Sequence, residues 1–156
     1  LHNLQKIDAE INQISKIDEY HFIDNINVSY LNLYYNNINQ IHCNAFINLV
    51  ALTEIYLYRN QIENVPKNLF QKNNLLKEIS LSHNKIRKID VDLFKNLEQL
   101  EELFLHNNKI EFINIETFRN NKKLINLWII NNNLTESNKN EIKSDNQYSK
   151  IKNFLV

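Results

Sequence analysis

The sequence predicts an α/β solenoid, in which one small structural unit is repeated along the chain and stacked on itself. Two observations support this fold class. An asparagine recurs every 24 residues in six copies, and the apolar residues on either side of it keep the same phase. A phase held over six copies indicates a continuous repeat array, in which each unit buries its apolar side chains against its neighbours. The asparagine column is Asn12, Asn36, Asn60, Asn84, Asn108 and Asn132.

Each repeat begins with a short strand, for which residues 100–106 give the clearest copy. There Leu103 and Leu105 alternate with Phe104 and His106, which is the period of a strand with one buried face. Parallel strands need a crossover connection, and the rest of each repeat is long enough to supply one. The repeats start at Leu4, Val28, Leu52, Leu76, Leu100 and Leu124.

Two columns of the repeat, one of asparagines and one of phenylalanines, are expected to stabilise the part of each repeat that follows the strand. We expect the asparagine to turn inward and hydrogen-bond backbone groups, which would otherwise cost about 1–3 kcal/mol each when buried without partners. Asparagine also tolerates left-handed backbone, so we expect this column to take the place of glycine, which the chain lacks. A phenylalanine column is expected to stack as core along the convex side: Phe22, Phe46, Phe70, Phe94 and Phe118.

The unit Leu100-Glu-Glu-Leu-Phe-Leu-His-Asn-Asn108 resembles the leucine-rich repeat family, in the 24-residue type common in extracellular animal proteins. The resemblance covers residues 1 to about 134. It implies a horseshoe with a short parallel β-strand per repeat on the concave face and an irregular, 3-10 or short helical convex side. We therefore predict six repeats over 1–134 and a degenerate last half-repeat, cap or tail over 135–156.

Three details of the chain add expectations. Leu1 already occupies a repeat position and no initiator methionine or signal peptide is visible, so we expect a fragment or processed form, with possible further repeats or caps outside it. Cys43 is the single cysteine, and its place before Phe46 predicts a buried or half-buried thiol. The position three before each start alternates between leucine and asparagine without evident reason: Leu1, Asn25, Leu49, Asn73, Leu97 and Asn121.

Composition argues against several function classes. The 18 basic and 18 acidic residues balance, which disfavours an electrostatic grip on nucleic acid, and no apolar run predicts membrane insertion of this segment. Without glycine, a phosphate-binding loop, a dinucleotide fingerprint and a nucleophile elbow are excluded. His83 and His106 alone are a weak metal signal. We therefore expect no enzyme, no cofactor and no metal site; the sequence leaves the homo-oligomeric state open.

The outward residues of the strands should form the concave face. Tyrosines on two adjacent strands, with Arg59, would form one patch, and these residue types are enriched at interface hot spots. The alternative is that cross-strand aromatic pairs merely stabilise the sheet. Phe104, Trp128 and Ile130 form a second patch. The acidic row Glu54, Glu78 and Glu102 meets a basic patch on a partner, coordinates a cation, or is simply solvated. The predicted binding residues are Tyr30, Tyr34, Tyr35, Tyr56, Tyr58, Arg59, Glu78, Glu102, Phe104, His106 and Trp128.

These observations favour a non-catalytic module that recognises a protein ligand on its concave face. The resemblance implies an extracellular setting, such as a receptor ectodomain, a secreted immune-recognition protein or an adhesion protein. The sequons at Asn27 and Asn133 are possible N-glycosylation sites of a secreted protein. The alternatives are a cytoplasmic scaffold or adaptor of the same fold, consistent with the lone cysteine, and a structural spacer within a longer horseshoe.

Overall fold

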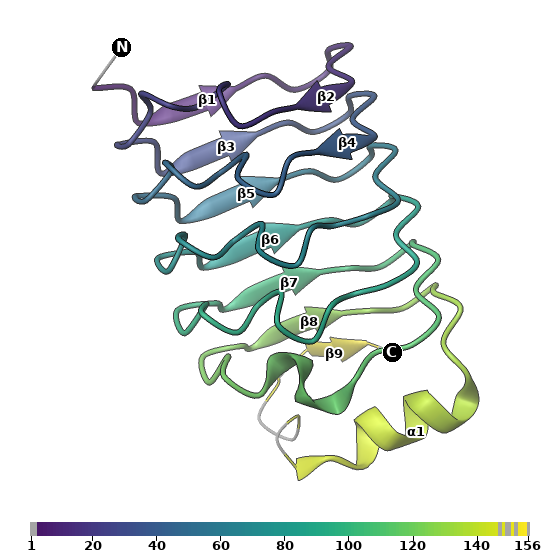
Figure 1. The fold of residues 1–156 in the computed structure, drawn as a ribbon. Coiled ribbons are helices and arrows are strands. Elements are labelled where there is room, and N and C mark those ends of the chain that lie inside the picture. Colours follow the sequence, from purple (N-terminus) through teal and green to yellow (C-terminus); the bar gives the residue numbers. More distant parts are fainter. Residues whose placement is uncertain (1–2, 147, 149–150, 152, 156) are drawn as a thin grey trace.

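A computed structural model describes residues 3–146, 148, 151 and 153–155 of the chain. Its main feature is a seven-stranded parallel sheet, and Figure 1 shows the strands stacked in chain order with the helix at the C-terminal end. The predicted α/β solenoid with one parallel strand per repeat is confirmed. The strands are β1 (Lys6–Asp8), β3 (Tyr30–Asn32), β5 (Glu54–Tyr56), β6 (Glu78–Ser80), β7 (Glu102–Phe104), β8 (Asn126–Trp128) and β9 (Asn153–Leu155).

Each residue of a strand pairs with the residue of the same phase in the next turn of the solenoid. Ile55 of β5 pairs with Leu31 of β3 and with Ile79 of β6, so residues of equal phase lie side by side. These central residues are fully buried, while the residues before and after them face the other side of the sheet. Phase in the sequence therefore gives position on the sheet directly.

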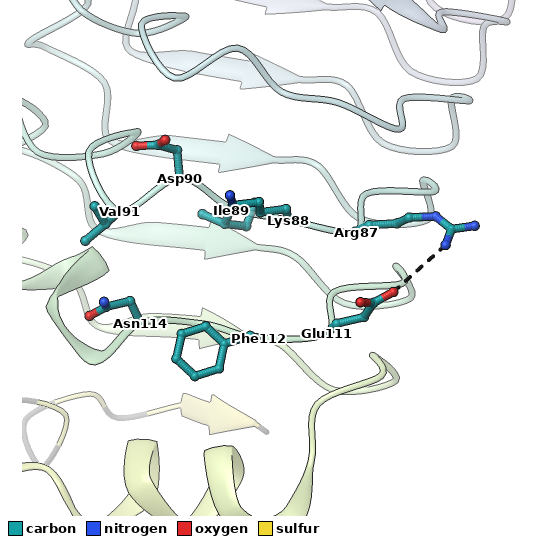
Figure 2. A pocket seen from close by; sticks show the side chains of 8 residues that line it. All are labelled: Arg87, Lys88, Ile89, Asp90, Val91, Glu111, Phe112 and Asn114. Atoms are coloured by element: carbon teal, nitrogen blue, oxygen red, sulfur yellow. Dashed lines mark ion pairs between the residues drawn. The ribbon is translucent and has the colours of Figure 1, made fainter.

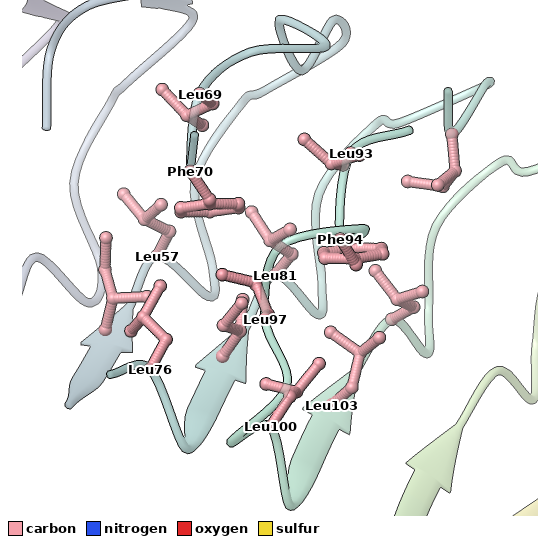
Figure 3. Packing of buried hydrophobic residues seen from close by; sticks show 14 of the residues in the cluster. Leu57, Leu69, Phe70, Leu76, Leu81, Leu93, Phe94, Leu97, Leu100 and Leu103 are labelled. Atoms are coloured by element: carbon pink, nitrogen blue, oxygen red, sulfur yellow. The ribbon is translucent and has the colours of Figure 1, made fainter. Parts of the chain in front are cut away.

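Phenylalanines and leucines fill the space between the sheet and the return segments. Figure 3 shows Phe70 and Phe94 packed among the leucines of neighbouring turns. The ring centroids of Phe46 and Phe70 lie 6.2 Å apart, those of Phe70 and Phe94 lie 6.4 Å apart, and Phe118 continues the stack at 5.9 Å from Phe94. This phenylalanine stack closes the core along its whole length.

The asparagine column ties each repeat to the preceding one. The Nδ2 of Asn84 donates to the carbonyls of Leu57 and Leu81, each at 3.0 Å, and its Oδ1 accepts from the Ile62 amide. Asn36, Asn60, Asn108 and Asn132 make the equivalent bonds. Asn12, at the first turn, is exposed and donates only to carbonyls of its own repeat, at Ala9 and Glu10.

The expectation that this column replaces glycine is wrong. The left-handed residue is the one immediately before each asparagine, with φ between 52° and 59°. This residue turns the chain out of the strand, and the next side chain then points inward. Only two of the six left-handed residues are asparagines, so the other four carry a steric cost that glycine would avoid. The six are Ile11, Tyr35, Arg59, His83, Asn107 and Asn131.

The alternation between leucine and asparagine has a structural reason. Asn73 is fully buried, and its Nδ2 donates to the carbonyls of Phe46 and Leu49, each at 2.9 Å. Asn121 does the same for the preceding turn, bonding the carbonyls of Phe94 at 3.0 Å and Leu97 at 2.8 Å. Each buried asparagine thus satisfies carbonyls around the leucine of the repeat before it. Leu1, which the alternation groups with Leu49 and Leu97, lies outside the described residues.

The return side of the solenoid is mostly irregular, as the resemblance implies. It carries a two-stranded sheet of β2 (Lys16–Ile17) and β4 (Gln40–Ile41), and a 3-10 helix η1 (Ile115–Phe118). Cys43 is exposed, so the expectation of a buried thiol is wrong: Ile41 and Ala45, on either side of it, fill the core instead.

The C-terminal segment folds against the last turn. Helix α1 (Glu136–Ser144) begins at the N-cap Thr135, buries Ile142, and is followed by Tyr148, whose hydroxyl donates to the Ile115 carbonyl at 2.7 Å. Strand β9 then pairs with β8 and extends the sheet. The boundary at residue 134 stays a prediction, and part of 135–156 lies outside the described residues.

Candidate protein-binding face

The tyrosines in β3 and β5 and just after these strands form one contiguous patch on the concave face. Tyr34 stacks on Tyr58 with ring centroids 4.1 Å apart and planes 18° apart, and Tyr30 lies 5.4 Å from Tyr56. These four rings are half-buried, whereas Tyr35 is 53% exposed at the edge of the face. The phase of the repeat brings them together because equal positions of adjacent strands are in register.

A second aromatic patch lies on β7 and β8. Phe104 and Trp128 pair at 5.6 Å in an edge-to-face arrangement, and His106 lies 5.5 Å from Trp128. Burial lowers the pKa of His106, and His83, whose ring lies 5.4 Å away, lowers it further. His106 is therefore neutral at pH 7. In the described part of the chain, no group of three or more histidine, cysteine or acidic residues is placed to hold a metal ion.

The acidic row continues the register position of Tyr30 across the next three strands. Glu54, Glu78 and Glu102 are direct cross-strand neighbours. Burial raises the pKa of Glu78 above its usual value, and the charges of Glu102 and Glu54 act in the same direction, while a hydrogen bond from Tyr56 lowers it. The Tyr56 hydroxyl also donates to Glu54 at 3.0 Å, and burial together with Glu78 raises the tyrosine's own pKa. Tyr56 thus stays neutral and keeps the single hydroxyl proton that it donates to Glu54.

Strand β6 interrupts the aromatic surface and leaves a hollow. Ser80 and Ser82 are buried and small, and Ser80 pairs with Tyr56 on one side and Phe104 on the other. We call the resulting space of about 420 Å³ the concave hollow. Its lining is Tyr34, Tyr56, Tyr58, Arg59, Glu78, Ser80, Ser82, His83, Phe104, His106 and Trp128.

The hollow itself was not predicted, and three of the residues that line it were missed as binding residues: Ser80, Ser82 and His83. The two serines were visible as the small members of otherwise bulky columns, and that contrast was the available signal. Of the predicted binding residues, eight line the concave hollow; Tyr30, Tyr35 and Glu102 lie around it on the same face. The sequon asparagines Asn27 and Asn133 are both exposed.

A larger hollow lies on the return side. Figure 2 shows that Arg87, Phe112 and Glu111 line it, and its volume is about 570 Å³. Phe112 is 55% exposed, at a phase where most repeats carry a polar residue, and sequence reasoning missed it. Arg87 and Glu111 form an exposed ion pair at 3.9 Å, which water screens. With a single aromatic ring in its lining, this space is a weaker candidate than the concave hollow.

The fold and this face together define a parallel-strand solenoid with an open, aromatic concave surface. The leucine rich repeat family model matches residues 2–62 and 51–110, which together make up more than half of the chain. The chain belongs to the leucine-rich repeat family, which is generally a non-catalytic protein-interaction fold. No curated protein matches it in sequence. No helix in the described part of the chain has the length and apolar character that a membrane crossing needs.

Solved structures of the same architecture superpose closely. A leucine-rich repeat protein of Leptospira interrogans is 25% identical, with a TM-score of 0.87 over 99% of this chain and 38% of that one. The leucine-rich repeat domain of APL1 is 27% identical, with a TM-score of 0.83 over 86% of this chain and 36% of that one. The LRIM1/APL1C complex is 26% identical, with a TM-score of 0.75, covering 80% and 23%. The chain therefore spans well under half the length of these relatives.

Proposed function

We propose that this chain is a non-catalytic recognition module that binds a protein ligand on its concave face. The observation that carries the proposal is the half-exposed aromatic surface over β3, β5, β7 and β8, broken only by the concave hollow. Large aromatic side chains beside an arginine are the groups that supply most of the binding energy at protein interfaces. A shallow open face of this kind does not exclude water from a reacting centre, which supports recognition rather than catalysis.

The setting we favour is extracellular: a receptor ectodomain, a secreted immune-recognition protein or an adhesion protein. The neighbour that is a complex of LRIM1 and APL1C gives one instance of this architecture within an assembly. The exposure of Asn27 and Asn133 supports a glycoprotein, since an acceptor must be accessible to be modified. A cytoplasmic scaffold is the second candidate, and the observation that favours it is the free, exposed thiol of Cys43, which a reducing compartment tolerates.

Affinity capture from native fluid or lysate, followed by mass spectrometry, tests the proposal. The variant Tyr34→Ser/Tyr58→Ser/Arg59→Ser removes the stacked pair and the arginine beside it. The matched control is Tyr20→Ser, which removes an exposed tyrosine of the return side. We expect partners that wild type and control retain and the triple variant loses, with circular dichroism showing all three folded. Identical capture by all three proteins would refute the concave face as the binding surface.

A further inference from the structure

We propose that the concave hollow receives the positively charged end of an arginine or lysine side chain from a basic segment of the protein ligand. This inference rests on the proposed function and names the chemistry that the same face would recognise. Two features of the hollow carry it: its aromatic walls and a carboxylate without an ion-pair partner.

The walls are spaced for a cation. Tyr56, Ser80 and Phe104 are cross-strand neighbours, so the two aromatic columns are separated by the single column of β6. Adjacent strands lie about 4.8 Å apart, and a group above Ser80 therefore lies about that distance from each column. Cations are attracted to aromatic faces within about 6 Å of the ring centroid, so both walls are within reach. The protein already makes one such contact, with Lys6 Nζ 4.3 Å from the Tyr30 ring centroid.

The carboxylate at this position forms no ion pair, although the Arg59 side chain lines the same hollow. Glu78 lines the hollow between Glu54 and Glu102, and no lysine, arginine or histidine in the described part of the chain forms an ion pair with any of the three. Like charges placed directly opposite each other destabilise a sheet. The tyrosine hydrogen bonds described above distribute this charge without cancelling it. A positive group of the ligand would complete the site.

Other ligand groups fit less well. An apolar side chain would fill the aromatic space but would cover Glu78 and deprive its carboxylate of water, which is unfavourable without a partner. A guanidinium stacks on aromatic rings and donates to a carboxylate at the same time. Arginine is therefore the side chain that we expect to bind best.

The single tryptophan of the chain reports on this site, because Trp128 lines the hollow. The probe is the blocked tripeptide acetyl-Gly-Arg-Gly-amide, titrated while the fluorescence of Trp128 is recorded. Its neutral counterpart carries citrulline, which keeps the shape of arginine and removes the charge. We expect a saturable change with the arginine peptide and at least fivefold weaker binding of the citrulline peptide.

Two variants locate the effect. Glu78→Gln should weaken the arginine peptide at least fivefold, while Glu63→Gln, an exposed glutamate of the return side, should leave it unchanged. Ser80→Tyr fills the hollow without altering any charge and should abolish the response. Circular dichroism establishes that each variant is folded, and a misfolded variant is replaced by Ser82→Tyr or Glu78→Ala.

Equal binding of the two peptides, no response to the arginine peptide, or full binding by Glu78→Gln would each overturn the inference. The proposed function is judged separately, by the capture experiment with the tyrosine triple variant. If that variant loses its partners while Glu78→Gln keeps them, the concave face binds protein but does not select a cation.

Discussion

Two arrays of aromatic rings run along this solenoid, one inside and one outside. The phenylalanine stack occupies every repeat from Phe22 to Phe118, and the rings from Phe46 to Phe118 are almost completely buried. The concave array is half-exposed. It is interrupted at β6, where Ser80 and Ser82 take the place of rings, and it resumes at β7. A core column must be filled in every turn because neighbouring turns share it. A surface column is free to vary, and its interruption is what creates the concave hollow.

The largest expected effect comes from breaking the inner array. Phe70→Ala removes a ring that stacks on two neighbours, and it should lower the free energy of unfolding by about 3–5 kcal/mol. Urea denaturation followed by circular dichroism measures this. Tyr58→Ala, in the outer array, serves as the comparison and should cost much less, because its ring is partly in water already. Equal losses would mean that the outer rings are structural.

The asparagine column should respond nearly as strongly. Asn84→Ala leaves the Leu57 and Leu81 carbonyls and the Ile62 amide without their partner, at a cost of about 2–3 kcal/mol. The control is Asn12→Ala, whose bonds are exposed and lie within one repeat. We expect the control to lie within about 0.5 kcal/mol of wild type, as exposed sites do. A tolerated Asn84→Ala would contradict the role of the column in joining repeats.

The left-handed positions allow a substitution that stabilises the protein. Ile11 combines a β-branched side chain with a φ of 54° and is 65% exposed. Asparagine adopts this conformation more readily, so Ile11→Asn should raise the free energy of unfolding by about 1 kcal/mol. The control is Ile23→Asn, which changes another exposed isoleucine whose φ is not positive. It should not raise the free energy of unfolding. Thermal denaturation compares the two, and an equal rise in both would trace the gain to lost surface hydrophobicity.

The smallest effect is a pH dependence at Glu78. Because burial, aided by Glu54 and Glu102, raises its pKa in the folded state, its neutral form favours folding, while the Tyr56 hydrogen bond opposes this. That stability is complete below the unfolded pKa and is lost as the pH rises through the raised one. Glu78→Gln stays neutral, so it should be more stable than wild type at pH 7 by less than about 1 kcal/mol, given solvent screening.

Urea denaturation across a pH series measures this difference, which should close as the pH falls below 4.5. Glu63→Gln, with the same change in net charge at an exposed site, corrects for long-range repulsion. A difference in stability that is constant over pH would show that the pKa of Glu78 is not raised in the folded protein.

The fold followed from the sequence because the repeat fixes it many times over. Position in the sheet depends only on phase, so the buried Leu103 and the half-exposed Phe104 could be assigned without coordinates. Details that depend on a single residue's backbone were out of reach. The left-handed turn fell one residue before the asparagine, and Cys43 proved exposed, because periodicity does not report φ or the direction of a loop side chain.

The candidate site divides in the same way. The aromatic residues could be placed on one face because they occupy the outward-facing phases of the repeat. Their role in binding stays a proposal. The hollow could not be predicted, since it depends on how the rings on either side of Ser80 and Ser82 are oriented, which periodicity does not report. The raised pKa of Glu78 likewise follows from burial of its carboxyl group, and the extent of that burial cannot be read from the sequence.

The buried Asn73 and Asn121, two repeats apart, have a consequence for how such an array can grow. Each one clamps its own turn to the turn before it, where leucine occupies the same phase. The smallest segment that can be duplicated or deleted without disturbing this pattern is therefore a pair of turns. A change by one turn would place two leucines or two asparagines at this phase in adjacent turns, and the alternation would be lost. We therefore expect the array to have grown by two turns at a time.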